Sequence, residues 1–281
     1  MVAEILQTMG TETKPVPRQE AVDGGAVADV TALDLRQLYL VDSPAQEEAY
    51  RKLKARTPAR LGSGRAGLRY KTLTMLRFRA DHAAAQDAVF SQVPEDYAAK
   101  NGLTPVQTRC ESKDQYLTRP DLGRCFDEEN LKIIRNTVPK GARVALVVGD
   151  GLSAAAIQAN AMDCMAAIRD SLKARHIEAA PPLFVRYCRV GAGDAVGSAT
   201  ECDLVCVLVG ERPGLVTDKS MSAYITYMPR TGVLESARTV VSNIHAQGTP
   251  AVEAGAHIGH LIATILEKKV SGVALQGEMG S

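Results

Sequence analysis

The chain has 281 residues, which is enough for one large domain or two modest ones. Its formal net charge of +1 excludes a strong overall field of the kind that attracts nucleic acid or an anionic membrane. Hydrophobic residues make up 46% of the sequence but aromatic residues only 4%, so we expect a core built mainly from aliphatic side chains.

The six cysteines form no CxxC pair, and several lie in segments that we expect to be buried. This usage favours reduced thiols in a cytosol-like compartment. No apolar run approaches the roughly 20 residues that a membrane-spanning helix needs. The first ten residues also lack the basic start and apolar centre of a signal peptide. We therefore expect no membrane and no nucleic acid among the partners.

Residues 1–33 are expected to form a flexible tail. Apolar residues in the first ten positions fall at helical spacing, and a stretch rich in Thr, Pro, Gly and charge follows. A frayed terminus is the simpler interpretation. The alternative is a targeting segment, in which a short tethered helix docks on a partner.

Residues 34–138 are expected to form a helical domain, with helices at 34–41, 44–54, 72–93 and 126–136. Residues 51–80 contain ten Lys or Arg and no acidic residue. A glycine-rich turn around Arg65 lies in this basic block, and backbone amides beside a guanidinium suit an anion. Docking of the basic block on an acidic subunit is an equally open interpretation.

Residues 139–281 are expected to form an α/β domain. Three apolar runs, at 144–148, 183–185 and 204–209, each end in a polar turn that contains glycine, which is typical of buried parallel strands. Extended runs at 220–227 and 239–244, a long helix at 250–269 and a short strand at 271–275 follow. The predicted fold class is α/β, with a doubly wound, mostly parallel sheet after the helical domain and the flexible tail. Ligands of such sheets bind beyond the carboxyl ends of the strands.

Three motifs at or near strand ends leave alternatives open. The spacing of Gly191-Ala-Gly193 fails the dinucleotide fingerprint, because position 196 is Val. The turn Gly149-Asp-Gly151 before a helix suits either a donor-bearing ligand or tight packing without a ligand. Glu253, His257 and His260 share a helix face, but without a second carboxylate helix we favour a solvated face over a metal site.

The sequence also contains a set of seven recognisable motifs. In chain order they are Gly64-Arg-Ala-Gly67, Leu76-Arg-Phe-Arg-Ala-Asp-His82, Tyr116-Leu-Thr-Arg-Pro-Asp-Leu-Gly-Arg124, Asp150-Gly-Leu-Ser153, Phe184-Val-Arg-Tyr187, Leu208-Val-Gly-Glu-Arg-Pro-Gly-Leu215 and Ser242-Asn-Ile-His245. With these motifs the chain resembles the light chain (small subunit) of ethanolamine ammonia-lyase over roughly residues 45–275.

The resemblance implies a subunit of an adenosylcobalamin-dependent lyase that converts ethanolamine to acetaldehyde and ammonia. A heavy chain would carry the substrate site, and this light chain would cover the cobalamin at the interface of a hetero-oligomer with several copies of each chain. No catalytic residue and no metal ligand are therefore expected in this chain. The resemblance also implies a location in an ethanolamine-utilising bacterial microcompartment or in the cytoplasm.

The resemblance implies that three residues of this sequence contact the corrinoid. Val190 and Glu211 each follow an expected strand, where the fold argument also points. Val240 lies near the start of its extended run and is not supported by that argument. Relatives often have Cys at this position, and Val keeps a backbone contact but removes any thiol role. The resemblance implies base-on cobalamin binding, and the absence of an Asp-x-His-x-x-Gly motif from the sequence agrees with it.

Two other function classes compete with this reading. A stand-alone nucleotide-binding α/β enzyme would need the complete glycine fingerprint. A non-catalytic scaffold would show no dependence on cobalamin at all.

Overall fold

The structure, a computed structural model, describes residues 29–279. The chain divides into two compact units, Met1–Leu73 and Thr74–Ser281. The expected tail of residues 1–33 and its possible targeting segment lie almost wholly outside the described residues. No helix within residues 29–279 is both long and apolar enough to cross a bilayer.

The described part of the first unit contains short elements around a buried lysine. These are η1 (Val30–Ala32), α2 (Glu47–Lys54), β1 (Arg65–Ala66) and β2 (Arg69–Tyr70), of which the last two form an antiparallel hairpin. The Lys54 ammonium group donates hydrogen bonds to the carbonyl oxygens of Leu35 and Leu61. Burial lowers the pKa of Lys54, and these carbonyls replace part of the water that the group loses.

The prediction of a helix at residues 34–41 is wrong. The Asp34 carboxylate accepts a hydrogen bond from the Arg36 backbone N–H at 2.9 Å, and the segment forms a turn. An aspartate that binds the backbone two residues on offers the chain an alternative to the helix. The expected second helix exists as α2, and the expected helix at 72–93 exists as α3 (Thr72–Phe90).

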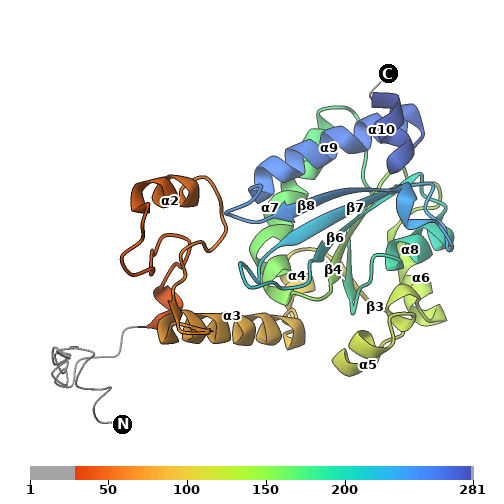
Figure 1. Cartoon of the computed structure of the whole chain (residues 1–281). Coiled ribbons are helices and arrows are strands. Elements are labelled where there is room, and N and C mark those ends of the chain that lie inside the picture. Colours follow the sequence, from red (N-terminus) through yellow and green to blue (C-terminus); the bar gives the residue numbers. More distant parts are fainter. Residues whose placement is uncertain (1–28, 280–281) are drawn as a thin grey trace, which may run out of the picture. The chain divides into compact units, whose positions relative to one another are not determined.

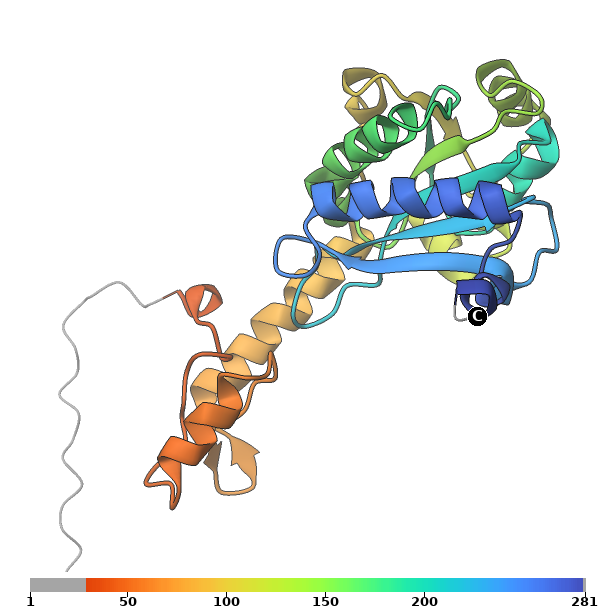
Figure 2. The ribbon, with the colours of Figure 1, turned by 90° about the horizontal axis from the view of Figure 1, so that it is seen from above.

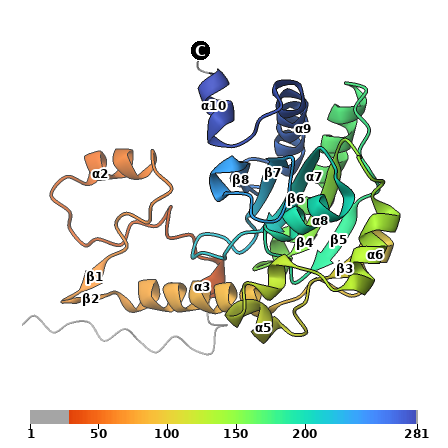
Figure 3. The ribbon, with the colours of Figure 1, turned by 90° about the vertical axis from the view of Figure 1, so that its right-hand side faces the viewer.

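The second unit is built on a six-stranded sheet in the order β3-β5-β4-β6-β7-β8, which can be followed in Figure 3. The strands are β3 (Thr104–Gln107), β4 (Ala145–Asp150), β5 (Leu183–Arg186), β6 (Leu204–Gly210), β7 (Met221–Tyr227) and β8 (Arg238–Ile244). The first four in this order are parallel to one another, whereas β7 runs antiparallel to both β6 and β8. The sheet is therefore mostly parallel, as expected.

Helices cover both faces of this sheet. The helices after α3 are α4 (Tyr97–Lys100), α5 (Lys113–Thr118), η2 (Leu122–Arg124), α6 (Glu128–Thr137), α7 (Ala154–Lys173), α8 (Ala192–Thr200), η3 (Glu235–Ala237), α9 (Ala251–Lys268) and α10 (Val273–Met279). α7 and α9 lie side by side on one face, whereas α6 and α8 pack on the other (Figures 1 and 2). Alternate residues of the central strands supply the two cores, because successive side chains of a strand point to opposite faces.

Two expectations about this unit need correction. Thr104–Gln107 lies inside the expected helical domain of residues 34–138, yet it forms β3 and pairs with β5. The division expected at residue 139 therefore does not coincide with the compact units. Residues 271–275 were expected to form a strand, but Val273–Met279 is the helix α10. Gly272, at φ +73°, turns the chain immediately before that helix.

Glycine allows α9 to approach α7 closely. A Cβ atom added at Gly255 would lie 2.3 Å from the backbone oxygen of Cys164 and 2.7 Å from the Cβ of Ala167. These distances are too short for any side chain, so the contact requires glycine. The helix pair forms one wall of the larger core.

We predict that Gly255→Val lowers the free energy of unfolding by about 3 kcal/mol, because overpacking against a backbone carbonyl cannot be relieved by a rotamer change. Gly277→Val is the matched control. It also lies in a helix, but its Cβ would meet no atom within 4 Å. Urea unfolding of the two variants measures the difference, and equal stabilities would contradict the close-packing argument.

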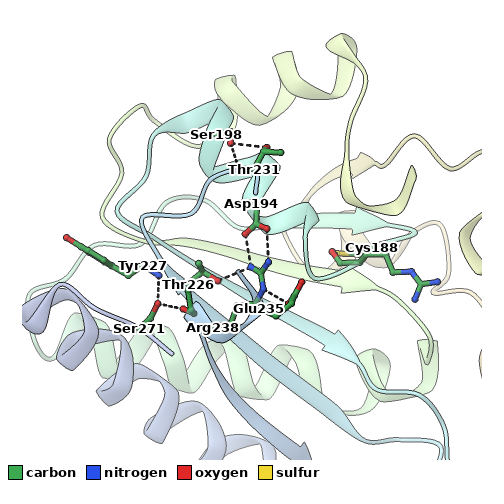
Figure 4. Close-up of polar contacts among 11 residues, drawn as sticks. Cys188, Asp194, Ser198, Thr226, Tyr227, Thr231, Glu235, Arg238 and Ser271 are labelled. Carbon is green, nitrogen blue, oxygen red and sulfur yellow. Dashed lines mark hydrogen bonds and ion pairs between the residues drawn. The ribbon is translucent and has the colours of Figure 1, made fainter. Parts of the chain in front are cut away.

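A buried ion pair connects α8 to the antiparallel end of the sheet. Arg238, on β8, donates from its two terminal nitrogens to the two carboxylate oxygens of Asp194, at 2.7 and 2.8 Å. Its Nε donates to Glu235 at 2.8 Å, and Thr226 of β7 lies within 3.3 Å of one terminal nitrogen. The Arg238 side chain is only 3% exposed. Figure 4 shows this fork of hydrogen bonds between α8 and the sheet.

We predict that Asp194→Asn lowers the free energy of unfolding by about 3–5 kcal/mol, since removal of one partner leaves a buried charge uncompensated. Asp96→Asn serves as the control, because Asp96 pairs with Lys100 at the surface, where an ion pair contributes at most about 1 kcal/mol. Thermal unfolding of both variants is the measurement. Similar melting temperatures would show that the Arg238 pair contributes little.

Candidate functional site

A cavity of about 430 Å³ lies at the carboxyl edge of the parallel strands. It takes its lining from the ends of β5, β6 and β8, from the start of β7 and from α5. The lining residues are Tyr116, Leu152, Cys188, Arg189, Val190, Val209, Gly210, Glu211, Arg212, Ser222, Tyr224 and Ser242. Cavities of about 740 and 550 Å³ also occur, beside the end of α7 and beside the end of β7. Neither contains an expected contact residue, so the strand-end cavity is the candidate site.

The direction of the strands explains why these residues meet. β6 ends where β7 begins, because the two strands are antiparallel, and β8 ends at the same edge because it is antiparallel to β7. The carboxyl ends of β5, β6 and β8 therefore lie on one side of the sheet. This is the edge at which open α/β sheets bind their ligands.

Glu211, one of the expected contacts, follows the last residue of β6 and lines the cavity. Its Oε1 accepts hydrogen bonds from the Ser222 hydroxyl and from the Asn243 backbone N–H, the latter at 2.9 Å. Among the described residues, none donates a hydrogen bond to Oε2. The Glu211 carboxylate is thus fixed through Oε1, and Oε2 can accept a hydrogen bond from a ligand.

A bulge between β7 and β8 supplies one of these hydrogen bonds. The pairing shifts register between Met221 and Ala223, and Asn243 has a left-handed backbone with φ 62°. Asn is among the few residues that adopt this conformation readily. The bulge directs the Asn243 N–H across β7 to Glu211, and the Asn243 side-chain oxygen lies 2.8 Å from Nε2 of His245. Bulges beside functional sites often re-aim groups in this way.

Val190, the second expected contact, is partly buried and lies in the turn between β5 and α8. Tyr187 in the same turn has a left-handed backbone with φ 56°, which is unusual for an aromatic residue. The Tyr116 hydroxyl stabilises this turn by donating a hydrogen bond to the carbonyl oxygen of Cys188 at 3.2 Å. Arg189 stacks on the Tyr116 ring and donates to its backbone oxygen at 2.7 Å.

Val240, the third expected contact, does not line the cavity itself but lies on the same face of the sheet. It pairs directly with Tyr224 of β7, and Tyr224 pairs with Val207 of β6. Tyr224 lines the cavity, as does Ser242, two residues beyond Val240 on the same strand. The structure therefore brings Val190 and Glu211 into one cavity and places Val240 beside it.

The turn at Gly149–Ser153 is packed at both ends, and Leu152 is its one residue in the cavity lining. Asp150 is 1% exposed, and its Oδ2 accepts a hydrogen bond from the Val93 backbone N–H at 3.1 Å. Burial raises the pKa of Asp150, although Lys113 opposes this shift. A Cβ at Gly149 would clash with Cys188, and the Ser153 hydroxyl caps α7 by accepting from the Ala156 N–H at 3.0 Å. These contacts support the tight-turn alternative.

The other motifs either contribute to packing or lie at the surface. A Cβ at Gly193 would lie 2.7 Å from Val207, so this glycine lets α8 approach β6. Glu253, His257 and His260 are exposed on α9. Within residues 29–279, no group of three or more His, Cys, Asp or Glu could hold a metal ion. Arg65 lies over the Tyr70 ring and donates to the Leu68 carbonyl at 3.1 Å, so its contacts are internal to the β1–β2 hairpin.

Sequence reasoning missed Ser222, Tyr224 and Ser242 as site residues. The signal that could have found the first two is the period of two in the run 220–227, which places Ser222, Tyr224 and Thr226 on one face. Deciding that this face meets the cavity required the strand order, which the sequence pattern does not contain.

Comparison with known proteins identifies the family. The model of the ethanolamine ammonia-lyase light chain family matches residues 47–276. The ethanolamine ammonia-lyase small subunit of Clostridium perfringens is 58% identical over 250 residues, which cover 89% of this chain and 85% of that protein. The small subunit of Clostridioides difficile is 53% identical over 277 residues, with 98% and 94% covered. That of Listeria monocytogenes serovar 1/2a is 54% identical over 258 residues, with 92% and 88% covered.

The match spans nearly all of the described residues, including every strand of the sheet and the whole cavity lining. The seven motifs quoted from the sequence lie inside it. The chain therefore belongs to the ethanolamine ammonia-lyase light chain family.

Proposed function

We propose that this chain covers adenosylcobalamin in an ethanolamine ammonia-lyase that converts ethanolamine to acetaldehyde and ammonia. The observation that carries the proposal is the cavity at the strand ends, where Val190 and the uncommitted oxygen of Glu211 lie together. A heavy chain would complete the site from the other side and supply the substrate site. The complex would contain several copies of each chain, in a bacterial microcompartment or in the cytoplasm.

The residues of the cavity fit a corrinoid. The rim of a corrin ring carries primary amides, whose N–H groups match the free acceptor at Glu211. Leu152, Val190 and Val209 supply apolar surface for the ring. Small-molecule sites usually measure about 300–1,000 Å³. The volume of about 430 Å³ suits one edge of so large a group, which agrees with a site shared between two chains.

When bound, adenosylcobalamin supplies an adenosyl radical by homolysis of its cobalt–carbon bond, and the protein must bind, orient and enclose it. This chain's residues would do the binding and enclosing. Glu211 would hold the rim of the corrin ring by accepting a hydrogen bond from one of its amides. Val190 and Val209 would exclude water from one side of the ring. No residue of this chain is assigned a catalytic role, since the proposal places the substrate site on the heavy chain.

A second role in nucleotide binding is less well supported. Gly191 and Gly193 lie at the start of α8, but Gly193 serves the packing of that helix on β6.

We predict that ethanolamine deamination requires this chain, a cognate heavy chain and adenosylcobalamin together. The reason is that the light chain supplies only one wall of the cofactor site and no substrate site. Titration of adenosylcobalamin into each pair of components and into the full mixture, with acetaldehyde as the readout, measures this. Full activity of the heavy chain without this chain would overturn the proposal.

We also predict that Glu211→Gln weakens corrinoid binding by the complex by about 10- to 100-fold. The amide can still accept from Ser222 and Asn243, but its free end becomes a donor, and a hydrogen bond to a charged group contributes about 1.5–3 kcal/mol. Glu253→Gln on the exposed face of α9 is the control and should bind normally. Equilibrium dialysis with cyanocobalamin reports affinity without turnover. An unchanged affinity for Glu211→Gln would remove Glu211 from the site.

A further inference from the structure

Tyr224 lies in the middle of the strand that links the expected contacts. It stands on β7 between Val207 of β6 and Val240 of β8, and its half-buried side chain lines the cavity. Because side chains alternate along a strand, Ser222 and Thr226 share its face, whereas Ala223 and Ile225 point into the core beneath α7 and α9. Tyr224 is thus directed to the side of the sheet that carries the site.

Helix α8 covers only part of this face. Asp194 of α8 binds Arg238, which pairs with Thr226, so the helix closes over that row of the sheet. One row further on, Val240 is 47% exposed, and Ser242 beyond it is also exposed. Tyr224 stands at this border. The cavity lining therefore runs from Glu211 to Tyr224, beside the exposed residues Val240 and Ser242 of β8.

The Tyr224 hydroxyl is available to a ligand. Among the described residues, none forms a hydrogen bond with it. The hydroxyl is not among the buried polar atoms that lack a partner, so it is accessible and can meet a ligand in the cavity. Burial raises the pKa of Tyr224, and Glu211 and Glu235 add to this shift, so the phenol stays neutral and can both donate and accept.

We propose that Tyr224 is a further contact residue for the corrinoid, with its ring as a wall against the rim of the macrocycle and its hydroxyl bound to a rim amide. This inference rests on the proposed function. The Glu211 acceptor and the neutral phenol together match an amide-bearing group. Val240 extends the same wall through apolar contact. Its position opposite Tyr224 explains how a residue near the start of β8 can contribute to a site at the strand ends.

The test compares Tyr224→Phe with Tyr227→Phe. Tyr227 lies three residues further along β7, on the opposite face of the strand, and packs against the core under α9. Each variant is assembled with the heavy chain, and the dissociation constant for cyanocobalamin is measured by equilibrium dialysis. Loss of one neutral hydrogen bond should weaken binding on the order of two- to tenfold for Tyr224→Phe. Tyr224→Ala should weaken it further, because the ring is lost as well. Tyr227→Phe should match the unmodified complex.

The outcomes separate this inference from the function on which it rests. If Tyr224→Phe and Tyr224→Ala both bind cyanocobalamin normally while Glu211→Gln binds weakly, the Tyr224 assignment is overturned and the proposed function stands. If the unmodified complex retains no corrinoid, both are overturned. Unfolding curves of the free light chain identify any variant whose weak binding reflects misfolding, and the hydroxyl-only change in Tyr224→Phe then decides the question.

Discussion

The site depends on the reversal of strand direction beside β6. Four parallel strands end at one edge, and an all-parallel continuation would have placed the next strand's start at the far edge of the sheet. Because β7 runs antiparallel to β6, and β8 antiparallel to β7, the start of β7 and the end of β8 return to the edge where β5 and β6 end. Glu211 can then reach across β7, to a hydroxyl on that strand and to a backbone N–H on the next.

Two kinds of close contact hold this arrangement in place. On one face, Gly255 brings α9 against α7, so the core under β7 is filled by helix packing. On the other face, α8 is attached to β8 through the forked hydrogen bonds between Arg238 and Asp194. A buried ion pair often contributes little net stability, but its geometry is specific. Here it attaches the first turn of α8 to β8, and the exposed part of β8 begins beyond this attachment.

The sequence was informative where the chemistry is local. Apolar runs that end in glycine-containing turns predicted β4, β5 and β6. Glu211 came from the resemblance, and the strand-end argument pointed to the same turn. β3 was missed because Thr104–Gln107 is short and begins with Thr-Pro, so it has neither a strong apolar pattern nor a usual strand start. The strand expected at 271–275 failed because its apolar residues suit a short helix equally well. The sequence pattern did not indicate Tyr224, and it did not support Val240, which came from the resemblance alone. Their proximity depends on the pairing of β7 with β8.

The exposed residues of β8 have a consequence for the free subunit. β8 is the outermost strand of the sheet, and an edge strand with exposed apolar residues such as Val240 is a template for pairing with another chain. The surface that would enclose a cofactor in the complex is therefore an aggregation hazard before assembly.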